Sequence, residues 1–133
     1  DTHIDSTSME KELLKISHLH GKYLNIMSYH RHIIRKLEAD YKIKRGLKED
    51  YYAGRMSQEE LDEYGWEPFL LNIKTKMGVE KYLDSDDDLI KILNKKIHHD
   101  ESISVCESIL QELKSRTFQL RDYISWERFV GGN

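Results

Sequence analysis

The most regular hydrophobic pattern in the chain lies between Met9 and Tyr41. Apolar or aromatic residues recur there in alternating steps of four and three, interrupted only by two histidines. A repeat of about 3.5 residues keeps one side of a helix facing one partner and is typical of a left-handed coiled coil. We call these positions the seam: Met9, Leu13, Ile16, His20, Tyr23, Met27, His30, Ile34, Leu37 and Tyr41. The same count then reaches Lys44, Lys48 and Tyr51, which predicts a helix that becomes basic and aromatic toward its end.

A second long helical pattern occupies the C-terminal part of the chain. It is predicted to open with Ser85 as the cap, followed by three aspartates that suit the positive end of the helix dipole. No Gly or Pro follows until Gly131. Residues 98–101 (His-His-Asp-Glu) interrupt the apolar positions and leave a bend or a break as alternatives. The apolar positions with helical spacing are Leu89, Leu93, Ile97, Ile103, Cys106, Leu110, Leu113, Leu120 and Ile124.

Residues 55–84 form the predicted connection between these helices. Ala53-Gly54 is expected to end the first helix, because glycine is the usual residue at a helix C-terminal cap. Ser57 and Glu60 form a capping-box pattern for a short helix that would end before Gly65. The bulky segment 66–71 is expected to pack across helix ends, and segment 72–84 is expected to be irregular or to hold one more short helix.

These patterns predict an all-α fold in which two long antiparallel helices form a coiled-coil-like hairpin. We expect one helical domain, with helix 1 at about 6–54 and helix 2 at about 85–130. Helix 1 carries further apolar residues off the seam, which widen its apolar face beyond what one helix covers. A homo-oligomer, either a dimer or a closed ring, is therefore expected. The off-seam residues are Leu14, Leu19, Leu24, Ile26 and Ile33.

Composition excludes several classes of protein. The net charge is −3, so bulk charge predicts no partner and any nucleic-acid affinity must come from local clustering. The single cysteine, Cys106, lies among helix-spaced apolar residues and is expected to be a buried small hydrophobe in a reducing compartment. No run of about 18 apolar residues and no signal pattern occurs, so we expect a cytoplasmic protein with no membrane partner.

The most promising functional segment is 31–55, which contains eight basic and four acidic residues. Cations that neutralise phosphates, together with aromatic faces on which unpaired bases stack, are what single-stranded nucleic acid requires. The alternative is a solvated helix end with cations near its negative dipole terminus. The candidate DNA-binding residues are Lys42, Lys44, Arg45, Lys48, Tyr51, Tyr52 and Arg55.

Other polar clusters favour structural roles. The aspartate-rich run 84–88 lacks the glycine and distal glutamate of an EF-hand loop, and a helix cap explains it. His18 with His20, and His30 with His32, point to different helix faces, so they do not have zinc-ligand spacing. No nucleophile elbow, phosphate loop or catalytic acid pair occurs. We therefore expect no metal, no cofactor and no enzymatic activity.

The motif Asp-Tyr-Tyr-Ala-Gly-Arg at 50–55 resembles the UvsY family, the recombination mediators of T-even-like phages. Residues 4–7 (Ile-Asp-Ser-Thr) precede it at the family's spacing. Residues 114–118 (Lys-Ser-Arg-x-Phe) and the Arg-Phe pair at 128–129 resemble the family's last helix, and Lys76-Met77 resembles its middle section more loosely. The resemblance covers nearly the whole chain, although the family has a few more N-terminal residues.

The resemblance implies a phage-encoded, non-enzymatic protein of the host cytoplasm that forms six- or seven-fold rings and binds single-stranded DNA. Such proteins weaken the grip of the single-strand-binding protein and help a RecA-like recombinase to assemble. The family's DNA contact is attributed to basic residues two and four positions before the motif's Asp, which are Lys48 and, as a departure, Gly46 here. The neighbouring Lys44 and Arg45 would supply the missing charge. The alternative function is an oligomeric coiled-coil scaffold that binds no nucleic acid.

Overall fold

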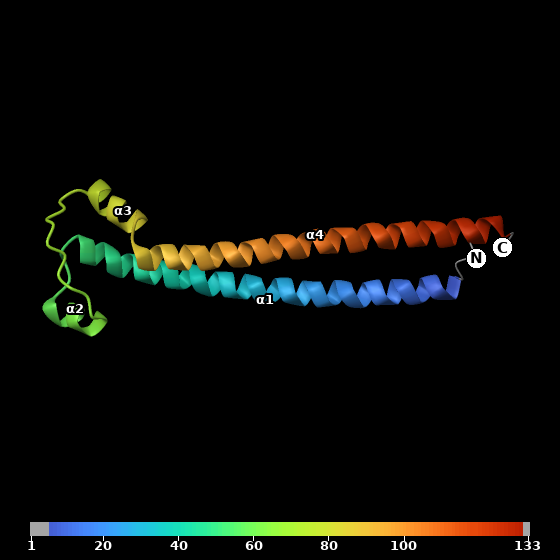
Figure 1. Ribbon diagram of the computed structural model, residues 1–133, viewed down its shortest axis with the longest axis horizontal. Helices are drawn as coiled ribbons and strands as arrows, with labels where there is room; N and C mark the ends of the chain where they lie inside the picture. Colours follow the sequence, from blue (N-terminus) through green and yellow to red (C-terminus); the bar gives the residue numbers. More distant parts are fainter. Residues whose placement is uncertain (1–5, 132–133) are drawn as a thin grey trace. The chain divides into compact units, whose positions relative to one another are not determined.

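The computed structural model describes residues 6–131, which contain four helices and no strand (Figure 1). They are α1 (Ser6–Tyr52), α2 (Gln58–Tyr64), α3 (Lys76–Asp84) and α4 (Asp87–Val130). The predicted all-α class with two long helices is confirmed. α4 is helical throughout, including 98–101, so the interruption in the apolar pattern does not break it. The Ile4-Asp5 part of the family motif lies outside the described residues.

The turns of the connection follow local sequence chemistry. α1 ends at Tyr52, and Gly54 then adopts a positive φ of 71° that reverses the chain. Ser57 caps α2: its side chain accepts from the backbone N–H of Glu60, and the Glu60 side chain accepts from the backbone N–H of Ser57. Gly65, at φ 69°, ends α2 in the left-handed region that glycine favours.

The beginning of α4 differs from the sequence prediction by one residue. The side chain of Asp86, not that of Ser85, accepts from the backbone N–H of Leu89 at 3.0 Å and thereby caps the helix. Ser85 instead ends α3, where its hydroxyl donates to the carbonyl of Lys81 at 3.2 Å. Both residues are good N-caps, so propensity alone does not choose between them. Asp86 is selected because its other oxygen has further partners in the folded chain.

The described residues group into two compact units. The single helical domain expected from the sequence stays a prediction. Unit 1 contains residues 6–32 and 100–131, and unit 2 contains Ile33–His99. In unit 1, α1 and α4 run antiparallel, as shown by Arg116 Nη2 at 3.1 Å from Glu12 Oε1 and by Arg31 facing Glu107. The buried side chains of this unit are Met9, Ile16, Met27, Cys106 and Ile124. Of the seam histidines, His20 is exposed and His30 is half-buried.

Unit 2 holds the turn between the long helices. α1 and α4 are antiparallel here also, with Lys96 Nζ 3.4 Å from Glu38 Oε1. α2 and α3 follow the C-terminal end of α1, and only two residues separate α3 from α4 (Figure 1). The core of the unit consists of Val79, Leu83 and Leu89, against which Tyr41, Tyr52, Ala53 and Ile73 pack. All the residues predicted to bind DNA belong to unit 2.

Candidate nucleic-acid interface

Lys48 lies where the spacing of the seam continues beyond Tyr41, and it is buried. It is 7% exposed, and its Nζ lies 3.2 Å from Asp86 Oδ2 and 2.9 Å from Asp88 Oδ2. The ammonium also stands 4.3 Å from the centre of the Trp66 ring, a cation–π distance. We call Lys48, Asp86 and Asp88 the Lys48 clamp, because it fastens the end of α1 to the start of α4. Its charge is already neutralised by two carboxylates, so Lys48 does not present a free cation to a phosphate.

The pKa values in the clamp show that it holds charged groups. Burial by itself lowers the pKa of Lys48, but hydrogen bonds to Asp88 and Asp86, together with their charges, outweigh it and raise this pKa. Burial by itself raises the pKa of Asp86, but hydrogen bonds from Tyr52, the Leu89 N–H and Lys48 outweigh it and lower this pKa. The pKa of Tyr52 is raised, first by burial and then by its bond to Asp86. Each shift favours the protonation state that the clamp requires.

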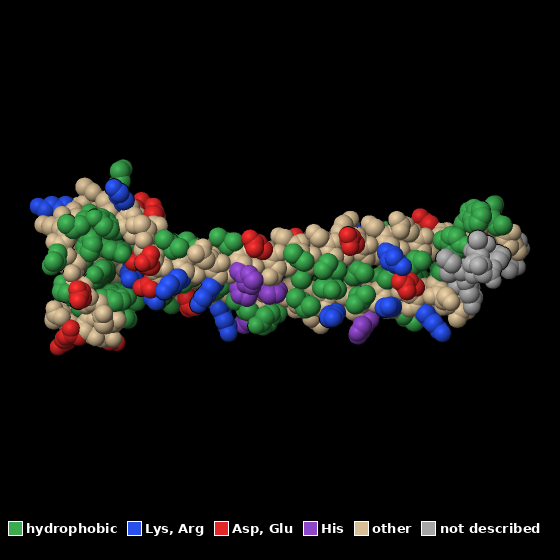
Figure 2. All heavy atoms as spheres, viewed as in Figure 1, with side chains coloured by type: hydrophobic (Ala, Val, Ile, Leu, Met, Phe, Trp, Pro, Cys, Tyr) green, Lys and Arg blue, Asp and Glu red, His purple; other side chains and the backbone are tan. Residues whose placement is uncertain are grey.

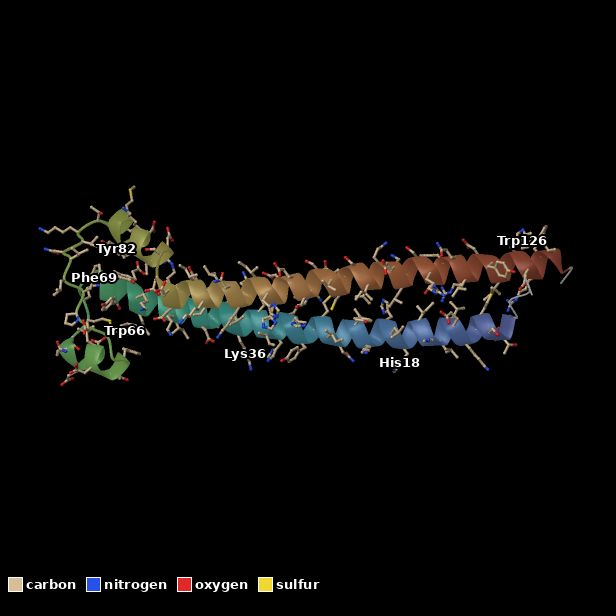
Figure 3. All side chains as sticks on the ribbon, viewed as in Figure 1. His18, Lys36, Trp66, Phe69, Tyr82 and Trp126 are labelled. Atoms are coloured by element: carbon tan, nitrogen blue, oxygen red, sulfur yellow. The ribbon has the colours of Figure 1, made fainter. Side chains whose placement is uncertain are left out.

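The two tyrosines of the motif are engaged in an aromatic cluster. The Tyr51 hydroxyl donates to the carbonyl of Glu67 at 2.6 Å, and the Tyr52 hydroxyl donates to Asp86 Oδ2 at 2.5 Å. Their rings contact each other and the rings of Trp66, Phe69 and Tyr82, which converge beside the end of α1 (Figure 3). Trp66 and Phe69 thus pack against the end of α1, as expected for segment 66–71, whereas Leu70 and Leu71 of the same segment are exposed. Figure 2 shows hydrophobic surface at this end of unit 2. Both tyrosines are half-buried, so base stacking on them would compete with these contacts.

The predicted cations Lys42, Lys44 and Arg45 lie on two sides of the α1–α4 contact. Lys42 lines a groove of about 280 Å³, which we call the Lys42 groove and which includes Lys96 of α4. Lys44 lines a second groove of about 350 Å³, the Lys44 groove, together with Lys95. Leu37 and Ile92 line both grooves and therefore separate them. Arg45 follows Lys42 by three residues, which places it on the same side of α1.

The two grooves differ in their floors, while each is lined by two lysines and one carboxylate. Tyr41, Ile92 and Leu93 give the Lys42 groove an aromatic and apolar floor, and Glu38 pairs with its Lys96. Asp40 reduces the positive charge of the Lys44 groove. Lysines at the edges of an apolar floor suit a single strand, because the cations meet phosphates while the bases meet carbon surface. A duplex keeps its bases stacked inside and cannot use such a floor.

Lys95 and Lys96 are interface candidates that the sequence prediction missed. They lie in the first half of α4, with Lys91 one turn earlier, and only the antiparallel packing of α4 on α1 places them beside Lys42 and Lys44. A count of lysines in residues 91–96 is the one signal in the sequence that points to them. Arg55, in contrast, is exposed and pairs with Asp50 at 2.9 Å from Nη2 to Oδ1.

No group of three or more His, Cys, Asp or Glu side chains within 6–131 is placed to hold a metal ion. No described helix is both long enough and apolar enough to cross a membrane. The basic side chains beside the α1–α4 contact of unit 2 gather in the two lysine-lined grooves.

The described residues form helices only, and their grooves combine lysines with apolar floors. These features are typical of helical proteins that are suited to bind an extended polyanion. The model of one family, described as "Recombination, repair and ssDNA binding protein UvsY", matches residues 1–133. The chain therefore belongs to the UvsY family.

Known proteins of this family resemble the chain over nearly its whole length. The recombination protein uvsY of Enterobacteria phage T4 is 26% identical over 132 residues, which are 99% of this chain and 90% of that protein. A crystal structure of the bacteriophage T4 recombination mediator protein UvsY superposes with a TM-score of 0.76 at 25% identity, covering 96% of this chain and 90% of the other. A second crystal form gives 0.75 at 24% identity, with 96% and 89% covered, and supports the fold alone.

Proposed function

We propose that this chain is a recombination mediator that binds single-stranded DNA as a ring-like homo-oligomer in the host cytoplasm. It would promote loading of a RecA-like recombinase in place of the single-strand-binding protein. The observation that carries the proposal is the family match over the whole chain, described in terms of recombination, repair and single-strand binding. The lysine-lined grooves of unit 2 supply a physical means for the DNA contact.

The contact that we propose differs in part from the set expected from the sequence. We assign direct contact to Lys42, Lys44 and Arg45 of α1, joined by Lys95 and Lys96 of α4. Lys48 and Tyr52 are assigned to holding the helices in place, because the clamp uses the ammonium and the hydroxyl. Tyr51 retains a half-buried ring at the edge of the aromatic cluster, where a base would meet it only after local rearrangement.

Self-association is proposed from exposed apolar side chains in unit 1. Phe118, Trp126 and Phe129 of α4 are 57%, 61% and 82% exposed, and Leu14 of α1 is 72% exposed. Apolar surface of this kind marks interaction sites when several such residues gather. A ring would repeat each weak groove several times around one assembly, and the resulting effective concentration would convert weak contacts into firm binding.

The test is fluorescence anisotropy of a labelled oligo-dT titrated with the full chain between 50 and 300 mM salt, about the range over which phosphate contacts lose their strength. The interface variant carries Lys42→Gln, Lys44→Gln and Arg45→Gln. A matched control carries Lys11→Gln, Lys15→Gln and Lys81→Gln, which are exposed lysines outside both grooves and remove the same number of charges.

We expect wild-type binding that weakens steeply with salt, and a large loss of affinity in the interface variant. The control should bind like the wild type, and light scattering should give all three proteins the same oligomeric mass. An oligomeric wild type that fails to bind at low salt would exclude the mediator and favour the coiled-coil scaffold. Equal binding by the interface variant and the control would show that the DNA contact does not lie in these grooves.

A further inference from the structure

A third basic pocket of unit 2 lies where the end of α1 meets the segment that precedes α3. It has a volume of about 350 Å³, near the lower end of the range of about 300–1,000 Å³ that is typical of ligand sites. It adjoins neither the floor of the Lys42 groove nor that of the Lys44 groove, and neither the clamp nor the aromatic cluster uses its cations. Its lining residues are Glu49, Ala53, Arg55, Ile73, Lys74, Thr75, Lys76 and Val79.

The wall of this pocket is built by packing. Ile73 contacts the core of the unit, and Thr75 Oγ1 accepts from the Gly78 N–H at 3.1 Å. A Cβ placed on Gly78 would lie 2.7 Å from Ile73 Cγ2 and 3.0 Å from Thr75 Oγ1, so only glycine permits this close approach. The first turn of α3 is therefore held against the segment before it. The Gly78 N–H is already satisfied by Thr75, so this donor of the helix N-terminus is not available to an anion.

Packing fixes where the basic side chains lie. Thr75 is extended, with φ −107° and ψ 144°, and its two neighbours in the chain, Lys74 and Lys76, both line the pocket. On the facing wall, the positive φ of Gly54 turns the chain back so that the Arg55 N–H donates to the Asp50 carbonyl at 2.8 Å. The Arg55 guanidinium also donates to Asp50 Oδ1, which holds its position on this wall.

The charges around the pocket are unbalanced. Three cations, Arg55, Lys74 and Lys76, line it with one carboxylate, Glu49. Within residues 6–131, no ion pair involves Lys74 or Lys76, whereas Arg55 is paired. Exposed lysines usually spread over a surface, and bringing them to one pocket with an arginine creates repulsion that a bound anion would relieve. A phosphate diester has the charge and the acceptor oxygens to bridge an arginine and two lysines.

We propose that this pocket binds a backbone phosphate of single-stranded DNA, extending the interface past the end of α1. The proposal rests on the proposed function, since it assumes that the protein binds single strands. The pocket chemistry is that of a phosphate group, which a strand or a free phosphate would carry. We assign it to the strand because the grooves and the pocket line the same unit and the same C-terminal part of α1.

The test uses a full-length pocket variant with Lys74→Gln and Lys76→Gln. Both residues are exposed, so the fold should persist, and circular dichroism checks this. A control with Lys11→Gln and Lys81→Gln also removes two positive charges, but outside the pocket. A second pocket variant, with Lys74→Arg and Lys76→Arg, keeps the charge. Oligo-dT anisotropy over a salt series gives the affinity and the slope of log K against log salt for each protein.

Loss of one phosphate contact should reduce the magnitude of that slope by about 0.7, the value for single strands. The affinity of the glutamine variant should fall about tenfold at low salt, as expected for one charge-assisted contact. The arginine variant and the control should stay within about twofold of the wild type. If the glutamine variant matches the control in both slope and affinity, the pocket takes no part in binding.

Calorimetry with inorganic phosphate separates the two sources of the anion. Saturable phosphate binding that the glutamine variant loses, combined with unchanged DNA binding, would assign the pocket to a free anion and overturn the proposal. A failure of the wild type to bind DNA is a different result, because it rejects the proposed function before any variant is compared.

Discussion

Replacing Lys48 by methionine separates two roles for this residue, because the resemblance makes it a DNA contact while the structure makes it a clamp. Methionine keeps an apolar stem beside Trp66 and removes only the charge. The Lys48 side chain is 9% exposed and that of Asp86 is 3% exposed, so the variant leaves Asp86 buried without its cation. Removing one partner of a buried ion pair typically costs about 3–5 kcal/mol.

Details of the clamp place the expected loss at the lower end of that range. Asp86 retains hydrogen bonds from Tyr52 and from the Leu89 N–H, and the Asp88 side chain is 41% exposed, so water can solvate it. We expect Lys48→Met to lower the free energy of unfolding by about 3 kcal/mol. For a chain of this length, that corresponds to a fall in Tm of roughly 10 °C.

The assay is urea unfolding followed by circular dichroism, with all proteins at one concentration because an oligomer's stability depends on it. The double variant Lys48→Met with Asp86→Asn should recover part of the loss, since it no longer buries a lone charge. DNA affinity at a temperature where the variant is folded should remain within a few fold of the wild type. A Lys48→Met protein with wild-type stability and greatly weakened DNA binding would refute the clamp and restore Lys48 as a phosphate contact.

Three further predictions follow from the same contacts. Because the pKa of Lys48 is raised, the clamp's contribution to stability is complete below about pH 10.4 and is lost at higher pH. Because the pKa of Asp86 is lowered, its contribution is lost as the pH falls below about 3.9. Unfolding midpoints measured from pH 8 to 11 should therefore fall less steeply with pH in Lys48→Met than in the wild type. Position 46 is exposed and a Cβ there meets nothing within 4 Å, so Gly46→Lys can add a cation without a clash. It should strengthen oligo-dT binding and steepen the salt slope by about 0.7 relative to Gly46→Gln, because one more phosphate would be neutralised. Equal slopes for the two variants would contradict this. Gly78→Ala should destabilise the protein by about 1–3 kcal/mol through the clash with Ile73, and an unchanged urea midpoint would show that the α3 turn tolerates a side chain.

Local signals in the sequence were sufficient where one segment determines its own structure. The seam spacing, Gly54 and the Ser57–Glu60 capping box each depend on neighbouring residues only, and the helices lie near the predicted positions. The cap of α4 was misplaced at Ser85 because Asp86 owes its position to Lys48 and Tyr52 as well as to the helix that follows. Propensity contains no information about partners from another helix.

The same limitation explains the differences in the candidate site. From spacing alone, Lys48 looks like the start of a basic surface, but its carboxylate partners follow much later in the chain and bury it. Tyr51 and Tyr52 look like stacking platforms until Trp66, Phe69 and Tyr82 return to meet them. Lys95 and Lys96 gain interest only through the pairing of α4 with α1, which no periodicity within one helix reveals.

The chain has two tryptophans, and one lies in each compact unit. Trp66 is half-buried beside the Lys48 ammonium in unit 2, whereas Trp126 is 61% exposed in unit 1. The intrinsic fluorescence of the unlabelled protein therefore contains one tryptophan signal from each unit. A Trp126→Phe protein would report optically on the clamp and its neighbouring grooves, and a Trp66→Phe protein on the exposed apolar surface of unit 1. Titrating each protein with DNA, and separately diluting each, would then show which unit responds to DNA and which responds to a change in protein concentration.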